Sequence, residues 1–167
     1  MVLTKSELIA SLEHEVRILV HLAGKVEASM LDYRPTPKQR STIELLRYMS
    51  MMGPTVVEAI NAEKFDPAKW TAAANAAAAR GFDETVAVID GQTAVYAALI
   101  GAMADADLRG DVQMFGVTRS RGSHIVNIVL SGHAAYRTQL FIYLKACGRT
   151  DLNTMNLWAG MDPPPKA

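Results

Sequence analysis

The spacing of apolar residues is the feature that most limits what this chain can fold into. Over residues 5–29, apolar side chains recur at intervals of three and four: Leu8, Leu12, Val16, Leu19, Ala23 and Val26. This period places them on one face of an amphipathic α-helix. No stretch of useful length alternates apolar and polar residues, as a half-buried strand does. The sequence therefore predicts an all-α protein.

Capping residues mark where the helices begin. Thr4 and Glu7 form a capping box ahead of the first helix, and Ser41 and Glu44 form one ahead of the second. In such a box the hydroxyl accepts a backbone N–H three residues on, and the carboxylate reaches back to the cap. Both starts are therefore well defined.

The remaining boundaries come from prolines, glycines and further caps. We expect Gly53-Pro54 to bend or interrupt the second helix, because proline has no N–H and its ring collides with the preceding turn. Three more helices are expected: a short one over 66–81 that lies across the bundle, a third long one from Asp83, and a fourth long one from Ser120 or Ser123 to Gly148. Four long helices and one short one predict a helical bundle.

Length and composition limit the classes of protein to which this chain can belong. The 167 residues suggest one domain over 1–167, and half of them are hydrophobic. Seventeen basic residues balance seventeen acidic ones, so net charge gives no case for nucleic acid or an anionic membrane surface. No apolar run is long enough to span a bilayer, and the start resembles no signal peptide, so we expect a cytoplasmic protein. The single cysteine, Cys147, excludes an internal disulfide.

The tail over 153–167 is rich in large apolar residues. It carries Met155, Leu157 and Trp158, which a solvated tail rarely has. We expect it to pack back onto the bundle or onto a second subunit.

Two stretches resemble a known family. "LDYRPTPKQRSTIELLRYM" (31–49) resembles the linker and second helix of the DinB/YfiT-like superfamily, and "GHAAYRTQLFIYLKACG" (132–148) resembles its fourth helix. The resemblance implies a four-helix bundle with up-down-down-up connectivity, commonly a homodimer. Many members bind a divalent metal through three histidines, one on the second helix and two spaced i and i+4 on the fourth. Some are thiol-dependent transferases and others are hydrolase-like.

The implied metal ligands are replaced in this chain. Aligning the motifs puts Tyr48, Gly132 and Tyr136 where the family has its histidines. His133 is displaced by one residue, which rotates a side chain by about 100° around a helix. Phenols with pKa values of about 10 are poor ligands for a divalent metal. We therefore expect no cofactor and no metal of the family's kind, with His133 as the one residual candidate.

The same residues are the candidates for a site. We predict that Tyr48, His133 and Tyr136 face one interior cavity that takes a small molecule, with Arg137 beside it. The alternative is a hydrogen-bonded core cluster in which each polar group satisfies another. Arg137 needs an acidic partner, and Asp32 or Glu44 are the candidates.

The other histidines and the cysteine are not expected to form a functional site. His14 and His21 fall on a polar helix face and are expected to be solvated. Cys147 lies at a helix C-terminus, where the dipole disfavours a thiolate. His124 and His133 are nine residues apart on one helix and point to opposite sides, so they cannot share a metal.

Several functions stay open at this level. The chain could be a metal-independent relative of the transferases, a metal-dependent or thiol-dependent transferase or hydrolase, a binding module for a small apolar ligand, or a structural homodimer. Loss of the metal histidines favours the last two.

Overall fold

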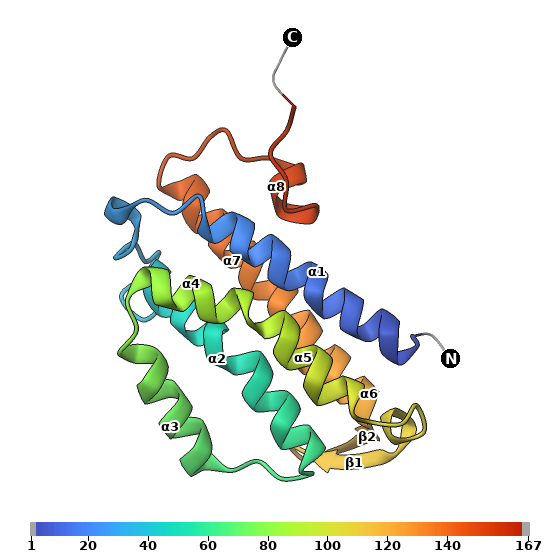
Figure 1. Cartoon of the computed structure of the whole chain (residues 1–167). Helices are drawn as coiled ribbons and strands as arrows, with labels where there is room; N and C mark the ends of the chain where they lie inside the picture. The colour runs from blue at the N-terminus through green and yellow to red at the C-terminus, as the bar shows by residue number, and fades with distance from the viewer. Residues whose placement is uncertain (1–2, 165–167) are drawn as a thin grey trace.

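Four long helical rods make up most of the computed structural model, which describes residues 3–164 (Figure 1). The rods are α1 (Lys5–Ala23), α2 (Thr42–Asn61), the pair α4 (Phe82–Asp90) and α5 (Gln92–Gly101), and the run of α6 (Arg121–His124), a π-helical segment (Ile125–Leu130) and α7 (Ser131–Ala146). The shorter elements are α3 (Pro67–Ala78), α8 (Thr154–Trp158), two 3₁₀ turns (Ala28–Met30 and Asp107–Arg109) and the strands β1 (Asp111–Met114) and β2 (Val117–Ser120). The all-α class is confirmed.

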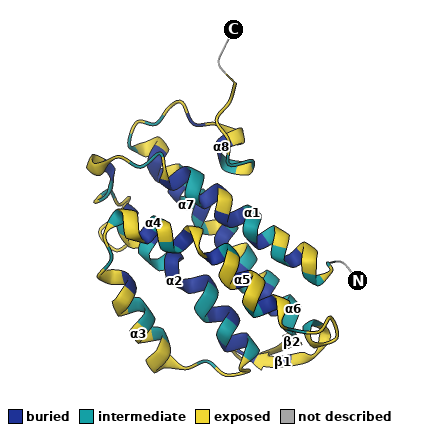
Figure 2. Ribbon diagram, viewed as in Figure 1, coloured by how far each residue is buried: buried dark blue, intermediate teal, exposed yellow. Residues whose placement is uncertain are grey.

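The rods pack around one core. In Figure 1, α1 and α7 run towards the end where α8 lies, while α2 and α5 run the opposite way. Their buried faces turn inward, as the dark blue stripes of Figure 2 show. The predicted stripe of α1 is buried at Leu8, Leu12, Val16 and Leu19. None of the helices within residues 3–164 has the length and apolar character needed to cross a membrane.

Both predicted capping boxes are present. Glu7 N donates to the Thr4 hydroxyl at 3.2 Å, and Thr4 N donates to the Glu7 carboxylate at 2.7 Å. Ser41 and Glu44 make the equivalent pair at the start of α2. The first helix ends at Ala23 rather than near residue 29, because Gly24 forms its C-cap and a 3₁₀ turn follows.

Of the bend or interruption expected at Gly53-Pro54, the interruption does not occur. The second helix runs unbroken through Pro54 to Asn61. Gly53 instead allows α2 and α5 to pack closely. A Cβ at this position would lie 1.8 Å from the Tyr96 hydroxyl oxygen, so only glycine lets α5 come this close to α2. The third long helix does break, at Gly91, which separates α4 from α5.

A β-hairpin lies in the connection between α5 and α6. Strands β1 and β2 pair antiparallel, with Asp111 opposite Ser120. Phe115 and Gly116 form the turn, with φ values of +51° and +77°. Positive φ at both central residues is typical of the type I′ turn that suits a tight hairpin. Strands of four residues are too short for their alternation to stand out in the sequence.

The segment after α7 folds back over α1 and α7 (Figure 1). Asn156 of α8 is buried and donates to His21 Nε2 at 3.1 Å, and His14 Nε2 lies 3.1 Å from the Trp158 carbonyl oxygen. His14 and His21 are therefore half-buried beneath this segment rather than solvated. Residues 165–167 of the predicted tail lie outside the described residues.

Candidate functional site

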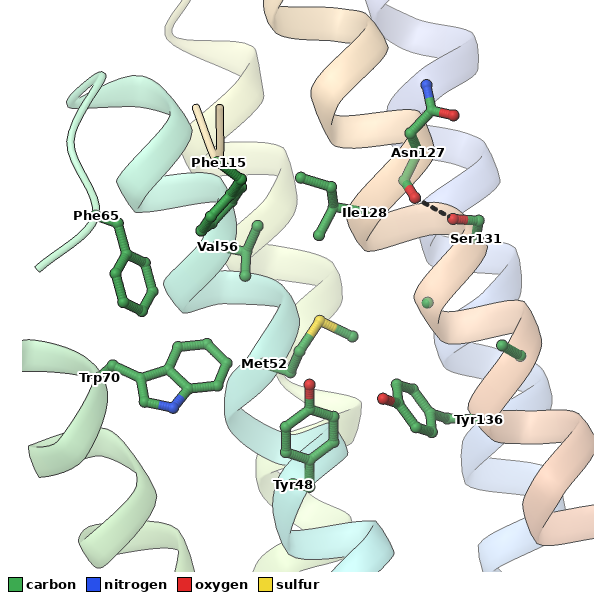
Figure 3. Close-up of a pocket in the computed structure, with 12 residues that line it drawn as sticks. Tyr48, Met52, Val56, Phe65, Trp70, Phe115, Asn127, Ile128, Ser131 and Tyr136 are labelled. Atoms are coloured by element: carbon green, nitrogen blue, oxygen red, sulfur yellow. Dashed lines mark hydrogen bonds between the residues drawn. The ribbon is translucent and has the colours of Figure 1, made fainter. Parts of the chain in front are cut away.

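An open cleft of about 530 Å³ lies between α2 and α7, flanked by α3 and the hairpin (Figure 3). Its lining side chains carry no formal charge, and five of them are aromatic: Tyr48, Met52, Val56, Phe65, Trp70, Phe115, Asn127, Ile128, Ser131, Gly132, Ala135 and Tyr136. Clefts of this size lined by apolar and aromatic groups are typical of small-molecule sites.

Helical spacing explains how α2 and α7 face each other here. Tyr48, Met52 and Val56 are four residues apart along α2 and so form one stripe. Gly132 and Tyr136 share a face of α7 for the same reason. At Gly132 a Cβ would meet Met52 Cε at 3.0 Å, so the missing side chain lets the thioether reach α7.

The aromatic rings form a continuous chain along the cleft. Ring centroids are 5.1 Å apart for Tyr136 and Tyr48, 6.3 Å for Tyr48 and Trp70, and 5.7 Å for Trp70 and Phe65. Phe115 at the tip of the hairpin continues the chain, 5.6 Å from Phe65. These are the edge-to-face and tilted distances at which ring pairs attract. Segments far apart in sequence thus build one aromatic wall.

The Tyr48 phenol stays neutral at ordinary pH. Burial, followed by the neighbouring Tyr136 hydroxyl, raises the pKa of Tyr48 to about 12. Figure 3 shows the hydroxyls of Tyr48 and Tyr136 pointing into the space between α2 and α7. A tyrosine hydroxyl offers a ligand an O–H donor and an acceptor oxygen.

A small polar group lies at the other end of the cleft. The Ser131 hydroxyl donates to the Asn127 carbonyl oxygen, and the Asn127 amide nitrogen donates to the Ser123 carbonyl oxygen at 2.7 Å. Asn127 belongs to the π-helical segment, a geometry that often occurs at functional sites.

His133 does not line this cleft, although Gly132 beside it does. Its side chain is fully buried, and its Nε2 lies 2.6 Å from the Tyr96 hydroxyl. That hydroxyl also reaches Gln92 Oε1 at 3.5 Å, and Gln92 Nε2 donates to the Met49 carbonyl oxygen at 2.8 Å. His133 therefore faces the interior, as expected, but its partner is Tyr96 and not Tyr48.

Burial dominates the chemistry of this inner network. It lowers the pKa of His133 to about 4 and raises that of Tyr96, so both groups are neutral at pH 7. The Tyr96 hydroxyl and His133 Nε2 share one hydrogen bond. Nδ1 of His133 has no hydrogen-bond partner within residues 3–164.

Arg137 lies neither in the cleft nor in the His133 network, but against α1 and α8. Its guanidinium pairs with Glu15 of α1, with Nε 2.5 Å from Oε2, and both side chains are almost completely buried. It also donates to the Leu157 carbonyl oxygen and lies 5.0 Å from the Trp158 ring centroid. The expectation that Asp32 or Glu44 would pair with Arg137 is wrong. Sequence spacing on α7 cannot tell which neighbouring helix faces this side chain.

The residues at the cleft do not fit the metal that the resemblance implies. All three positions that align with the family's histidines, Tyr48, Gly132 and Tyr136, line the cleft. They provide two neutral phenols and one position without a side chain, whereas zinc needs nitrogen, thiolate or carboxylate ligands. Within residues 3–164 there is no group of three or more His, Cys, Asp or Glu placed to hold a metal. His133, the residual candidate, points to the sealed network instead.

Some lining residues were not predicted from the sequence. Phe65, Phe115, Asn127 and Ser131 come to the cleft from a loop, the hairpin and the start of the last rod. The local sequence does not mark Phe115 as a turn residue, because tight hairpins favour Asn-Gly or Asp-Gly at these two positions. Nothing local distinguishes Phe65.

Comparison with known proteins supports the fold only. No protein-family model matches the sequence, and no curated protein matches it significantly. Among solved structures, the chain is similar to a DinB-like protein, YjoA, from Bacillus subtilis, with a TM-score of 0.66 and 12% sequence identity. The match covers 87% of this chain and 95% of that one. The protein therefore has the fold of a DinB-like protein over most of its length.

Proposed function

We propose that this protein is a DinB-like bundle that binds a flat, largely apolar small molecule in the cleft between α2 and α7, without a metal. The observation that supports it is the chain of five aromatic rings around an uncharged cleft, at the place where the resembled family has its metal ligands. Rings arranged edge to face offer their surfaces to a planar ligand.

The cleft residues favour binding over catalysis. General acid–base catalysis works best with a group whose pKa lies near the operating pH. The Tyr48 phenol, with a pKa of about 12, is far from that range. His133 is the imidazole nearest to the cleft in sequence, but it is sealed in the core and bonded to Tyr96.

A neutral dye tests the proposal. N-phenyl-1-naphthylamine fluoresces when it enters an apolar site and accepts energy from tryptophan. The chain has two tryptophans, so a Trp158→Phe background leaves Trp70, which lines the cleft, as the sole donor. We expect saturable binding with one dye per chain and energy transfer from Trp70.

A matched pair of variants locates the dye. Ala135 lines the cleft on the exposed side of α7, whereas Ala146 is exposed on the same helix and lines none of the hollows described. Ala135→Phe should weaken binding about tenfold or more, the loss of about 1.4 kcal/mol of contact, while Ala146→Phe should not. Equal effects of the two changes, or absence of saturable binding, would contradict the proposal.

The metal-dependent or thiol-dependent alternative makes a different prediction. Elemental analysis of purified protein should give well below one zinc, nickel or iron per chain, because the cleft lacks suitable donors. About one ion per chain, lost when Tyr48 and Tyr136 are both changed to Phe, would favour that alternative instead.

The homodimer stays a prediction. Ile142 on α7 and Met155 and Trp158 on α8 are large apolar side chains that remain exposed, and a second subunit could cover them. Sedimentation at micromolar concentration distinguishes a dimer from a monomer. A structural dimer with no ligand would show dimerisation but no dye binding.

A further inference from the structure

We propose that the ligand of the cleft carries one anionic group, a carboxylate or a sulfonate, and that Arg40 binds this group in an adjoining hollow. This inference rests on the proposed function, because it assigns the chemical class of the molecule that occupies the aromatic cleft.

A second hollow of about 350 Å³ adjoins the aromatic cleft. It lies between the N-terminal half of α2 and α3, and it shares Tyr48 and Trp70 with the first cleft. In the arrangement we propose, the aromatic part of the ligand lies against these two rings and its anionic group reaches the second hollow. The two spaces differ sharply in charge.

Charged residues line the second hollow, in contrast to the first. Arg40, Glu44 and Arg47 all contribute to its wall. Glu44 is already engaged, because its carboxylate accepts from Ser41 N at 2.8 Å and pairs with Arg34 at 3.3 Å. The Glu44 carboxylate is therefore neutralised by Arg34, which does not line the hollow. Arg40 and Arg47 leave the wall with excess positive charge.

Arg47 is held in place by the neighbouring loop. Its Nε and Nη2 both donate to the Arg80 carbonyl oxygen, at 2.9 and 2.5 Å. These bonds satisfy part of the guanidinium but do not neutralise it. Arg47 therefore contributes a fixed positive charge at the base of the hollow, and Arg40 is the residue with free donors.

The Arg40 guanidinium is held in one orientation and has N–H donors left for an anion. Its guanidinium carbon lies 4.0 Å from the centroid of the Tyr48 ring, a cation–π contact that orients the side chain. Within residues 3–164 its guanidinium makes no hydrogen bond, although it carries five N–H donors. Its backbone is anchored, because the buried Tyr143 hydroxyl donates to the Arg40 carbonyl oxygen at 3.1 Å.

The arrangement fits an amphipathic planar ligand. An aromatic body against Trp70 and Tyr48 would place a substituent at the Tyr48 edge within reach of Arg40. A planar guanidinium pairs with a carboxylate or sulfonate through two N–H donors, which gives orientation as well as affinity. A ligand without an anionic group would leave the Arg40 guanidinium without a partner for its N–H donors.

A pair of dyes that differ by one sulfonate tests the inference. 8-Anilinonaphthalene-1-sulfonate is N-phenyl-1-naphthylamine with one added sulfonate. We expect the sulfonated dye to bind at least about fivefold more tightly at low salt, as for a partly solvated ion pair. Added salt should remove most of this preference, because exposed charges are screened.

Variants assign the preference to Arg40. Arg40→Gln should reduce the preference for the sulfonated dye over the neutral dye to about one, whereas Arg40→Lys should keep part of it. Lys38→Gln removes an equal charge from the same exposed loop, but Lys38 lines neither hollow, so it should leave the ratio nearly as it is.

The outcomes separate the two proposals. If neither dye shows saturable binding that Ala135→Phe blocks, the proposed function fails and this inference fails with it. If the neutral dye binds in the cleft but the sulfonate adds nothing, or if Lys38→Gln acts as strongly as Arg40→Gln, only the anion site is overturned.

Discussion

Residues 132 and 133 are neighbours on α7, yet they face two regions built in opposite ways. His133 enters a sealed network with Tyr96 and Gln92, where protein atoms occupy almost every hydrogen-bonding position. Gly132 faces an open cleft, and the Tyr48 and Tyr136 hydroxyls point into the space between α2 and α7. A single helical step of about 100° separates the two environments.

The two regions differ in how their polar groups are hydrogen-bonded. In the sealed network the imidazole and the phenol satisfy each other, as buried polar groups normally must. The core-cluster alternative joined His133 to Tyr48 and Tyr136, whereas the structure joins it to Tyr96. In the cleft, Ser131 and Asn127 already donate to backbone carbonyl oxygens, and the polar groups that a ligand meets are the two tyrosine hydroxyls. The regions should therefore respond differently to the same kind of change.

The largest difference should come from adding one methyl group to each region. Gly53→Ala places a Cβ 1.8 Å from the Tyr96 oxygen and 2.9 Å from His133 Nε2. Overpacking and a stranded buried hydroxyl should together cost about 3 kcal/mol or more in the free energy of unfolding. Denaturant titration measures this loss.

Gly132→Ala is the matched control in the cleft. Its Cβ meets the flexible end of Met52 at 3.0 Å, which can move aside. Alanine is also the better helix former by about 1 kcal/mol, so stability should change little or rise. Similar losses at both positions would show that the cleft is packed as tightly as the core.

The second difference concerns pH. Burial lowers the pKa of His133 to about 4 in the folded state, below its usual value of 6.5. Between these values the unfolded chain binds the proton and the folded chain does not, so stability is present above pH 6.5 and is lost as the pH falls towards 4. The full loss is on the order of 3 kcal/mol.

A substitution isolates this contribution. His133→Gln removes the titrating group and keeps a polar partner for Tyr96. Unfolding free energies of the two proteins, measured from pH 4 to pH 7, should converge as the pH falls. Parallel curves over this range would mean that His133 is not the source.

Tyr136→Phe should have a smaller effect on stability. It removes one hydroxyl from a half-buried ring and leaves the aromatic contact with Tyr48 in place. We expect a loss of less than about 1 kcal/mol, since the hydroxyl can be replaced by water. A loss of several kcal/mol in thermal unfolding would place Tyr136 in the core instead.

Phe115→Gly should have the smallest effect on stability. Phe115 has a φ of +51°, which costs a bulky residue about 1–2 kcal/mol relative to glycine. Loss of its contact with Phe65 offsets this relief, at about 0.5–1.5 kcal/mol. The net change should stay within about 1 kcal/mol, while affinity for the neutral dye falls severalfold. Unchanged dye affinity would show that the ring is not a ligand contact.

The sequence by itself predicted the local features of this protein. The apolar period and the caps at Thr4 and Ser41 placed the helices, because both depend on residues within one or two turns of each other. The family register also placed Tyr48, Gly132 and Tyr136 together at one position, and the structure brings all three to the cleft. Helical spacing also predicted that His133 would face the interior, and it does, although its partner there is Tyr96 and not Tyr48.

Only the tertiary structure decided which distant residues meet. Arg137 pairs with Glu15, 122 residues away, and His133 meets Tyr96 across 37 residues because Gly53 on a third helix makes room. The hairpin that brings Phe115 to Phe65 depends on a turn conformation that its phenylalanine disfavours. Periodicity fixes the face on which a side chain lies, but the neighbour across that face is set by how the rods pack, and spacing along one chain segment does not encode that choice.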